Sequence, residues 1–427
     1  MKTTSKTLRR DRGLQRKLQG ILPKFIRHRL IRNMIHIEQN MDSKLKIRIA
    51  HTQEELSEAY RILQDSYEEM GYAQPTPSGM RITKYYAMPT TTTFIALWDD
   101  VVIGTMSIIQ QSTMGLPAEN SFNLKDLQKN GARVAEISSL AIHKNFRHQR
   151  GKVFLPLCKF LHDYSRDHLK LDYSVITVNP TWVDFYEGYL LFQRLPAKTV
   201  EKYDFANGAP AVGLYIDWNQ FDQNYEKVYG NRPVDKNAFH FFKSKGHTCL
   251  EYPNREFQVS QDPVLSPDML NYFFRQCSNI FLQLSEQEIQ ALWGAYPREN
   301  YQEVLPQLKE HQQKEIELQE SRFAVSLYAQ DVRSESQTIR VLDVSMTGLR
   351  IQGQMPLNHE DQLINLRLFV NPQTVIQLQG KICWTNQDHQ LHGIQIVKMD
   401  HHWKNYISFL QRRFPRSIET SYTILTA

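Results

Sequence analysis

The chain has 427 residues, more than one ordinary hydrophobic core accommodates, so two or three domains are expected. Its hydrophobic fraction of 41% and aromatic fraction of 11% are typical of a globular protein and exclude a largely disordered one. The formal net charge is +6, and the positive excess is unevenly spread along the chain.

Four cysteines lie far apart in the sequence and form no C-x-x-C pair. We therefore predict buried thiols in a reducing compartment and no metal centre. No run of about 18 apolar residues is present to span a membrane, and the N-terminus lacks the apolar core of a secretory signal. A cytoplasmic protein is expected. The cysteines are Cys158, Cys249, Cys277 and Cys383.

Residues 1–43 form a basic leader in which apolar residues recur at roughly helical spacing, although Pro23 interrupts any single helix. Two alternatives fit this composition. The leader is either an interfacial segment that contacts an anionic inner-membrane surface, or it packs against a helical connector with its charges solvated. Nucleic acid is not an expected partner, because Phe25 is the leader's only stacking aromatic residue.

Residues 44–221 alternate between strand-like and helix-like patterns, which predicts a mixed α/β domain. Asp99 and Asp100 form the turn of an expected hairpin, and Thr52 is the expected N-cap of the first helix. Strands are expected at 45–50, 93–98, 101–110, 133–142, 173–178 and 212–217, and helices at 52–70, 153–168 and around 180–188.

Residues 222–317 are predicted to form a helical extension that connects two domains. Ser266 before Pro267 and Ser285 before Glu286 are typical helix starts. Helices are expected at 265–283, 284–296 and 301–320.

Residues 318–413 alternate with period two, and turns rich in Gly, Asn and Pro separate the short apolar runs. This pattern predicts a small all-β barrel. A helix that begins at residue 401 closes the barrel, and residues 414–427 form a tail. Strands are expected at 322–332, 338–345, 348–353, 361–370, 375–385 and 391–399.

The strand, basic loop and helix at 133–168 form the first unit with chemical meaning. Backbone N–H groups of such a loop and the helix N-terminus point towards an anion. Arg147, Arg150 and Lys152 add positive charge there. Taken alone, the loop favours the alternative of a solvated basic turn.

The second unit is NPTWVDFYEGYLLFQRLP at 179–196. A similar segment of the GNAT acyltransferase superfamily places a Tyr beside the thioester sulfur, where a hydroxyl protonates the leaving thiolate. Tyr186 stands at the matching position. The alternative for Phe185 and Tyr186 is a core aromatic pair on a short helix.

Together, the segments VAEISSLAIHKNFRHQRG, NPTWVDFYEGYLLFQRLP and NGAPAVGLYID resemble the N-acyl amino acid synthases, which are GNAT-fold relatives of the acyl-homoserine-lactone synthases. The resemblance covers residues 45–220. It implies transfer of a long acyl chain from acyl carrier protein to the amine of an amino acid.

The resemblance also implies roles for residues of the central strand. Glu136 falls at the acidic position, where a carboxylate accepts the amine proton directly or through water. Backbone N–H groups beside Ser138 and Ser139 hold the carbonyl oxygen as negative charge develops. The alternative for Glu136 is an ordinary charge at a strand edge.

Two departures from the related families affect the expected donor. Related synthases often carry Arg where Ser139 stands, and the acetyl-CoA loop of the superfamily has Gly where Arg150 and Lys152 stand here. Cations in place of Gly suit the phosphopantetheine phosphate of an acidic carrier protein better than the pyrophosphate of CoA. We expect acyl carrier protein as the donor and partner, with no permanently bound cofactor.

Asp343-Val344-Ser345-Met346-Thr347-Gly348 matches the D-x-S-x-x-G signature of PilZ domains, over a resemblance that covers about 318–413. Family members that bind cyclic di-GMP carry an R-x-x-x-R loop before the barrel, because paired guanidinium groups suit phosphates and guanine edges. Arg322 matches the second Arg of that loop, but Leu318 replaces the first. Cyclic di-GMP bound by Arg322, Asp343, Ser345 and Gly348 and a barrel used for packing or partner contact both remain open.

We predict a GNAT-like α/β domain, a helical connector and a PilZ barrel. The predicted function is N-acylation of an amino acid or related amine by acyl carrier protein. A non-catalytic signalling adaptor that binds cyclic di-GMP or a partner is the second hypothesis, and an acetyl-CoA-dependent acetyltransferase is the third. New N-acyl species in lipid extracts of expressing cells distinguish the enzyme from the adaptor.

Overall fold

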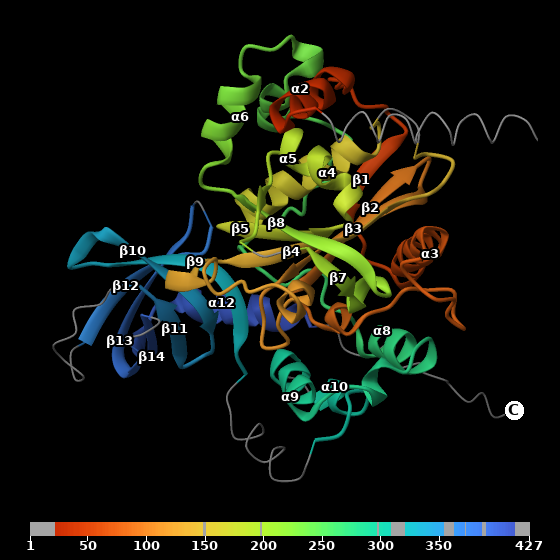
Figure 1. The fold of residues 1–427 in the computed structure, drawn as a ribbon. Coiled ribbons are helices and arrows are strands. Elements are labelled where there is room, and N and C mark those ends of the chain that lie inside the picture. The colour runs from red at the N-terminus through yellow and green to blue at the C-terminus, as the bar shows by residue number, and fades with distance from the viewer. Residues whose placement is uncertain are drawn as a thin grey trace, which may run out of the picture.

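The computed structural model of the protein describes residues 22–147, 151–196, 199–296, 299–308, 321–353, 363–371, 373–386 and 390–414 (Figure 1). This part of the chain contains a mixed sheet of eight strands covered by helices, and a closed barrel of six antiparallel strands. The predicted combination of an α/β domain with a small all-β barrel is confirmed. Within the described ranges, no helix has the length and apolar character that crossing a membrane requires.

The large sheet follows the order β1-β2-β3-β4-β5-β8-β6, and β7 pairs with β8 off this path. Its neighbours are antiparallel except for β4 and β5, which run parallel. Asp99 and Asp100 both adopt positive φ in the predicted turn between β2 and β3. The strands are β1 (Leu45–Ile49), β2 (Thr91–Trp98), β3 (Val101–Gln110), β4 (Val134–Ile142), β5 (Tyr173–Val178), β6 (Gln193–Arg194), β7 (Val200–Tyr203) and β8 (Ala209–Asp217).

Helices cover both faces of this sheet (Figure 1). One face packs against α2 (Lys24–Met34), α4 (Phe154–Asp163), α5 (Val183–Gly188), α6 (Phe221–Tyr229) and α7 (Ala238–Lys243). The other face packs against α3 (Gln53–Met70), α8 (Pro267–Asn271), α9 (Glu286–Ala295) and α10 (Glu299–Gln302).

Helix α3 begins at the predicted N-cap. The Thr52 side chain accepts a hydrogen bond from the Glu55 N–H, and the Glu55 carboxylate accepts one from the Thr52 N–H. This reciprocal capping box satisfies donors that have no partner within the helix. Gly71 ends the helix with φ of 76°, a left-handed conformation that Gly adopts without steric cost.

The helix predicted at 265–283 is interrupted in the structure. Helix α8 begins after its Ser266 cap and ends at Asn271, after which the chain forms a π-helical turn to Gln276. The Ser278 hydroxyl donates a hydrogen bond of 2.8 Å to the carbonyl of Phe273. Local side-chain bonding of this kind competes with the helical ladder.

The helix predicted at 301–320 is wrong over its first residues. Helix α10 ends at Gln302, and the guanidinium of Arg275 donates to the non-helical carbonyls of Val304 and Leu305 at 2.9 and 3.1 Å. Pro306 then lacks the N–H that a continuing helix requires. Residues 309–320 of the predicted helix lie outside the described residues.

The barrel closes in the order β10-β11-β14-β13-β12-β9. Helix α12 (His401–Arg412) begins at Asp400 and covers one end, with Trp403 fully buried. The strands are β9 (Phe323–Asp331), β10 (Ser334–Val344), β11 (Gly348–Gln352), β12 (Leu363–Phe369), β13 (Val375–Asn386) and β14 (Leu391–Met399).

The barrel and the α/β domain share one hydrophobic core. Its cluster of buried side chains includes Val134 and Val175 of the sheet together with Phe323 and Leu327 of the barrel. Figure 1 shows the barrel beside the end of the sheet where β5 begins. Because the contact includes core residues of both lobes, the two domains pack as one unit.

The prediction that all four thiols are buried is wrong for Cys383, which is exposed. The residue lies in β13 where the pairing with β14 shifts register between Ile382 and Trp384. Even-numbered positions in the first half of β13 are the buried ones, so the alternation of the strand already places Cys383 on its outward face. Cys158 and Cys249 are buried, and Cys277 is half-buried.

Candidate active site

Glu136 is fully buried in β4. Its Oε2 accepts a hydrogen bond of 2.7 Å from the backbone N–H of Ala118. Its Oε1 is buried without a hydrogen-bond partner among the residues that the structure describes. Buried polar atoms are nearly always paired in native proteins, so this oxygen marks a place where a ligand donor or a water belongs.

Burial raises the pKa of Glu136 to about 8, although the Ala118 N–H favours the charged form. The carboxylate of Glu119 adds a smaller upward effect on this pKa. A carboxyl group with this pKa changes protonation state near neutral pH, as a general base must. Tyr67, Tyr85 and Tyr203 lie near Glu136, and their pKa values are raised by burial and by its charge.

Ser138 and Ser139 lie at a bulge in the same strand. Ser107 pairs with Ser138 and Thr105 pairs with Ala141, so residues 139 and 140 face a single residue of β3. Ser139 has φ of 59°, and its hydroxyl bonds the hydroxyl of Tyr86. A bulge leaves backbone groups outside the ladder, and strained positions of this kind concentrate at functional sites.

The parallel pairing of β4 and β5 is short. It begins at Val134 with Tyr173 and ends at Glu136 with Val175, although β4 continues to Ile142 and β5 to Val178. The strands separate directly after Glu136, so their facing edges beyond this point are not paired with each other. Unpaired strand edges accept an extended ligand through main-chain hydrogen bonds.

Tyr186 lies on α5, in an aromatic cluster with Phe185 and Phe192. Burial raises the pKa of Tyr186, so its hydroxyl stays protonated at neutral pH. The charge states of nearby Cys158 and Tyr67 raise this pKa further. Tyr67 interacts electrostatically with both Glu136 and Tyr186, so both predicted catalytic groups lie near it.

The basic loop places its predicted residues differently. Arg147 is half-buried and donates to the carbonyl of Ile142 at 2.6 Å and to Ser66 Oγ at 2.8 Å, and it forms an ion pair with Glu69. Lys152 is exposed, with its Nζ 3.4 Å from Glu38. Arg150 lies outside the described residues.

The predicted nucleotide-site residues of the barrel come together at the start of β9 and the turn between β10 and β11. Arg322 Nε donates to Asp343 Oδ1 at 2.7 Å, and Arg350 Nε lies 2.6 Å from Asp343 Oδ2. Ser345 is fully buried, and its N–H donates to the carbonyl of Gly348 at 2.8 Å. Leu318 lies outside the described residues.

The sequence did not indicate that α2 supports the helix of Tyr186. Arg27 donates to both carboxylate oxygens of Asp184 at 2.8 and 3.0 Å, and Lys24 Nζ donates to Glu187 at 2.9 Å. Asp184 and Glu187 are three positions apart, so both lie on one face of α5. The acidic face of α5 and the basic composition of the leader are the sequence features that could have indicated this contact.

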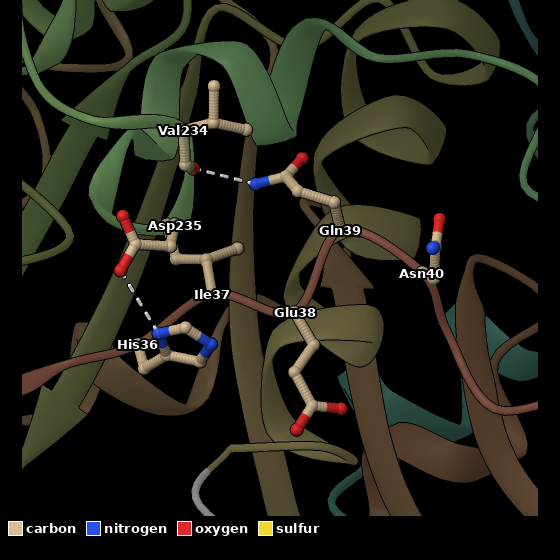
Figure 2. Close-up of a pocket in the computed structure, with 7 residues that line it drawn as sticks. All are labelled: His36, Ile37, Glu38, Gln39, Asn40, Val234 and Asp235. Carbon is tan, nitrogen blue, oxygen red and sulfur yellow. Dashed lines mark hydrogen bonds and ion pairs between the residues drawn. The ribbon is translucent and has the colours of Figure 1, made fainter.

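Figure 2 shows a separate surface hollow of about 540 Å³ between the segment 36–40 and the residues Val234 and Asp235. Its polar groups engage one another: His36 Nδ1 lies 3.2 Å from Asp235 Oδ2, and Gln39 donates to the Val234 carbonyl at 2.8 Å. None of the predicted site residues lines this hollow.

Comparison with known families yields two matches. The model of the N-acyl amino acid synthase FeeM matches residues 58–217, and the model of the PilZ domain matches residues 318–409. Among curated proteins there is no significant match.

Solved structures similar to the chain include FeeM, an N-acyl amino acid synthase from uncultured soil microbes, at 25% identity and a TM-score of 0.37. The match covers 42% of this chain and 93% of that one. The acyl-homoserine-lactone synthase LasI matches at 18% identity and a TM-score of 0.35, over 45% and 98% of the two chains. Residues 58–217 therefore form an acyltransferase domain similar to the N-acyl amino acid synthases, and residues 318–409 form a PilZ domain.

Proposed function

We propose that this N-acyltransferase moves a long-chain acyl group from the thioester of acyl carrier protein to the amine of an amino acid. The observation that carries the proposal is the unpartnered Oε1 of Glu136. It belongs to a buried carboxyl group with a pKa near 8, at the point where β4 and β5 separate. A base in that position meets an amine that attacks a thioester held between the two strands.

The residues of the site divide the chemistry. As the amine nitrogen bonds to the thioester carbon, its proton passes to Glu136. The developing oxyanion is held by backbone N–H groups at the bulge of Ser138 and Ser139, which suits preorganised stabilisation. The carbon–sulfur bond then breaks, and the hydroxyl of Tyr186 protonates the leaving thiolate.

The donor is proposed from the shape and charge of the site. The edges of β4 and β5 beyond Glu136 suit the extended, amide-bearing arm of phosphopantetheine. Exposed Lys152, together with Arg147 and Arg150 of the same loop, offers positive charge to an acidic carrier protein. Both described cations have an acidic neighbour, but Lys152 is exposed and 3.4 Å from Glu38 whereas Arg147 is half-buried, so Lys152 is the more available of the two.

The proposal is tested with purified protein, acyl carrier protein loaded with a long-chain acyl group, and a panel of amino acids. Glu136→Gln and Tyr186→Phe are expected to slow N-acyl product formation by about 10²- to 10⁴-fold each, the usual contribution of an acid–base group. Exposed Glu226→Gln is the control and should retain full activity. Unchanged rates in both site variants would remove their roles.

A second proposed activity is binding of cyclic di-GMP by the barrel, as a regulator of acyl transfer. Arg322 and Arg350 keep 43% and 48% of their side-chain surfaces exposed while both contact Asp343. Two half-exposed guanidinium groups held side by side suit the phosphates and guanine edges of a cyclic dinucleotide. This pair supports ligand binding even though Leu318 replaces the first Arg of the family's loop.

We also propose peripheral contact of α2 with an anionic membrane. The helix is anchored to α5 through Arg27, yet Leu30 and Met34, which lie one turn apart on one face, are 47% and 81% exposed. Apolar side chains beside cations are typical of an interfacial helix. A long-chain N-acyl product partitions into lipid, so a site next to the membrane favours its release.

A further inference from the structure

One side chain of the barrel reaches the strands that carry the candidate active site. Arg340 of β10 donates from Nη1 and Nη2 to the two carboxylate oxygens of Asp172 at 2.6 and 2.8 Å. Its Nη1 also donates to the carbonyl of Gly131 at 2.8 Å. The two side chains are only 23% and 12% exposed, so solvent screens this bidentate pair weakly.

Asp172 is the residue that immediately precedes β5. Besides Arg340, its carboxylate accepts a hydrogen bond of 2.8 Å from the N–H of Arg133, which immediately precedes β4. The next residues, Val134 and Tyr173, form the first of the three pairs between these strands. Asp172 therefore ties the starts of β4 and β5 together, two residues before Glu136.

A second contact holds the same segment against the barrel. The guanidinium of Arg133 donates to the carbonyl of Leu327 at 3.0 Å and lies 4.9 Å from the ring centre of Tyr328. Gly131 has φ of 66°, and a Cβ there would approach Gln352 Oε1 of the barrel to 1.4 Å. Gly at position 131 thus suits both the left-handed backbone and the close approach of the Gln352 side chain.

We propose that Arg340 is a positioning residue for acyl transfer, through which the PilZ barrel fixes the short β4–β5 pairing and the place of Glu136. The inference rests on the proposed function of Glu136 as the base. With three residue pairs between the strands, a shift at the first pair reaches the third, where Glu136 lies and the strands separate. The barrel is accordingly a part of the catalytic architecture.

The first experiment measures kcat/KM against pH for Arg340→Ala, Arg340→Lys and Asp172→Asn. We expect kcat/KM to fall by about 10- to 100-fold in Arg340→Ala and Asp172→Asn, because a small displacement of a catalytic group lowers the rate by about this factor. We also expect the acidic limb of the pH profile to move. Arg340→Lys keeps the charge but loses the bidentate fork, so its loss should be smaller. Arg333→Ala, exposed in the turn between β9 and β10, is the matched control and should behave as wild type.

The acidic limb of the pH profile reports on Glu136. The titratable groups that lie near Glu136 belong to the α/β domain. They are Tyr67 of α3, Tyr85 of the 3-10 turn before β2, Glu119 of the loop before β4, and Tyr203 of β7. None of these four groups belongs to the barrel. A substitution at Arg340 that moves this limb therefore acts through the strands.

A second readout separates this inference from the proposed reaction. The free energy of unfolding is measured against pH for wild type and Glu136→Gln, and the difference between them isolates the titration of Glu136 without turnover. The same difference is measured between Arg340→Ala and the double variant Arg340→Ala/Glu136→Gln. A changed Glu136 titration in the Arg340 variants supports the inference even if no acyl donor is used. The inference is overturned if the Arg340 variants are less stable but keep the Glu136 titration and the pH profile of wild type. If Arg340→Ala does not fold, the same comparison with Arg340→Lys decides.

Discussion

At the scale of single residues, the burial of Glu136 lowers the stability of the fold and raises the pKa of this group into the range that a general base requires. A carboxyl group with a usual pKa near 4.5 is held at about 8 in the folded chain. Between these two values the folded state binds a proton that the unfolded state has released. The contribution of this group to the free energy of unfolding is therefore fully present below pH 4.5 and is lost as the pH rises through about 8. The fold thus contains a group that destabilises it at the pH where we propose that this group acts as a base.

This coupling gives a prediction for Glu136→Gln. The variant cannot ionise at position 136, so its free energy of unfolding should fall less than that of wild type between pH 4.5 and pH 8. The difference should grow by up to about 1.4 kcal/mol per pH unit. Denaturant midpoints measured at several pH values check it, with exposed Glu226→Gln as the control. Parallel curves for wild type and Glu136→Gln would contradict the assigned pKa.

The sequence predicts some residues of the site and not others. Glu136 and Tyr186 follow from motifs whose residues are close together in the chain. The Ala118 N–H that holds Glu136 and the nearby Tyr203 come from distant loops and strands. These groups are brought to Glu136 by tertiary packing. The sequence has 20 tyrosines, and no local pattern singles out those that lie near Glu136.

At the scale of elements, local rules explain the predictions that are confirmed. Thr52 and Glu55 form the capping box that starts α3, and period-two alternation marks the strands of the barrel. The separation of β4 from β5 after three pairs has no such local signal. Ile137 and Leu140 of β4, and Ile176 and Val178 of β5, continue the strand-like sequences beyond Glu136, so nothing local marks where the pairing ends.

The cluster at the start of β9 and the β10–β11 turn gives a prediction for the barrel. Cyclic di-GMP should bind, and Arg322→Ala should weaken binding by tens of fold, because a charged hydrogen bond contributes about 1.5–3 kcal/mol. Calorimetry measures both affinities, with Arg333→Ala as the control. Leu318→Arg should tighten binding if the site is degenerate. The absence of heat for every variant at high ligand concentration would leave the barrel as a packing module.

At the scale of the whole molecule, α2 and the barrel lie at different sides of the sheet, and both contact elements of the site (Figure 1). Helix α2 is bound to α5, the helix of Tyr186, by Arg27 and Asp184. The barrel is bound to the starts of β4 and β5 by Arg340 and Asp172. A membrane at one side and a nucleotide at the other would therefore each act on a helix or strand that carries a proposed catalytic group.

The last prediction concerns the membrane side. Full-length protein should float with vesicles that contain anionic lipid, and salt should release it, because each Lys or Arg near such a surface contributes about 1 kcal/mol. Leu30→Ser/Met34→Ser removes the two exposed apolar side chains that share one face of α2 and should abolish or strongly reduce flotation. Leu282→Ser is the matched control, since Leu282 is 86% exposed on the other face of the sheet and should not matter. Removal of residues 1–21, which leaves α2 in place, measures the share of the basic leader. Equal flotation of wild type and the double variant, or none by either, would show that α2 does not contact the membrane.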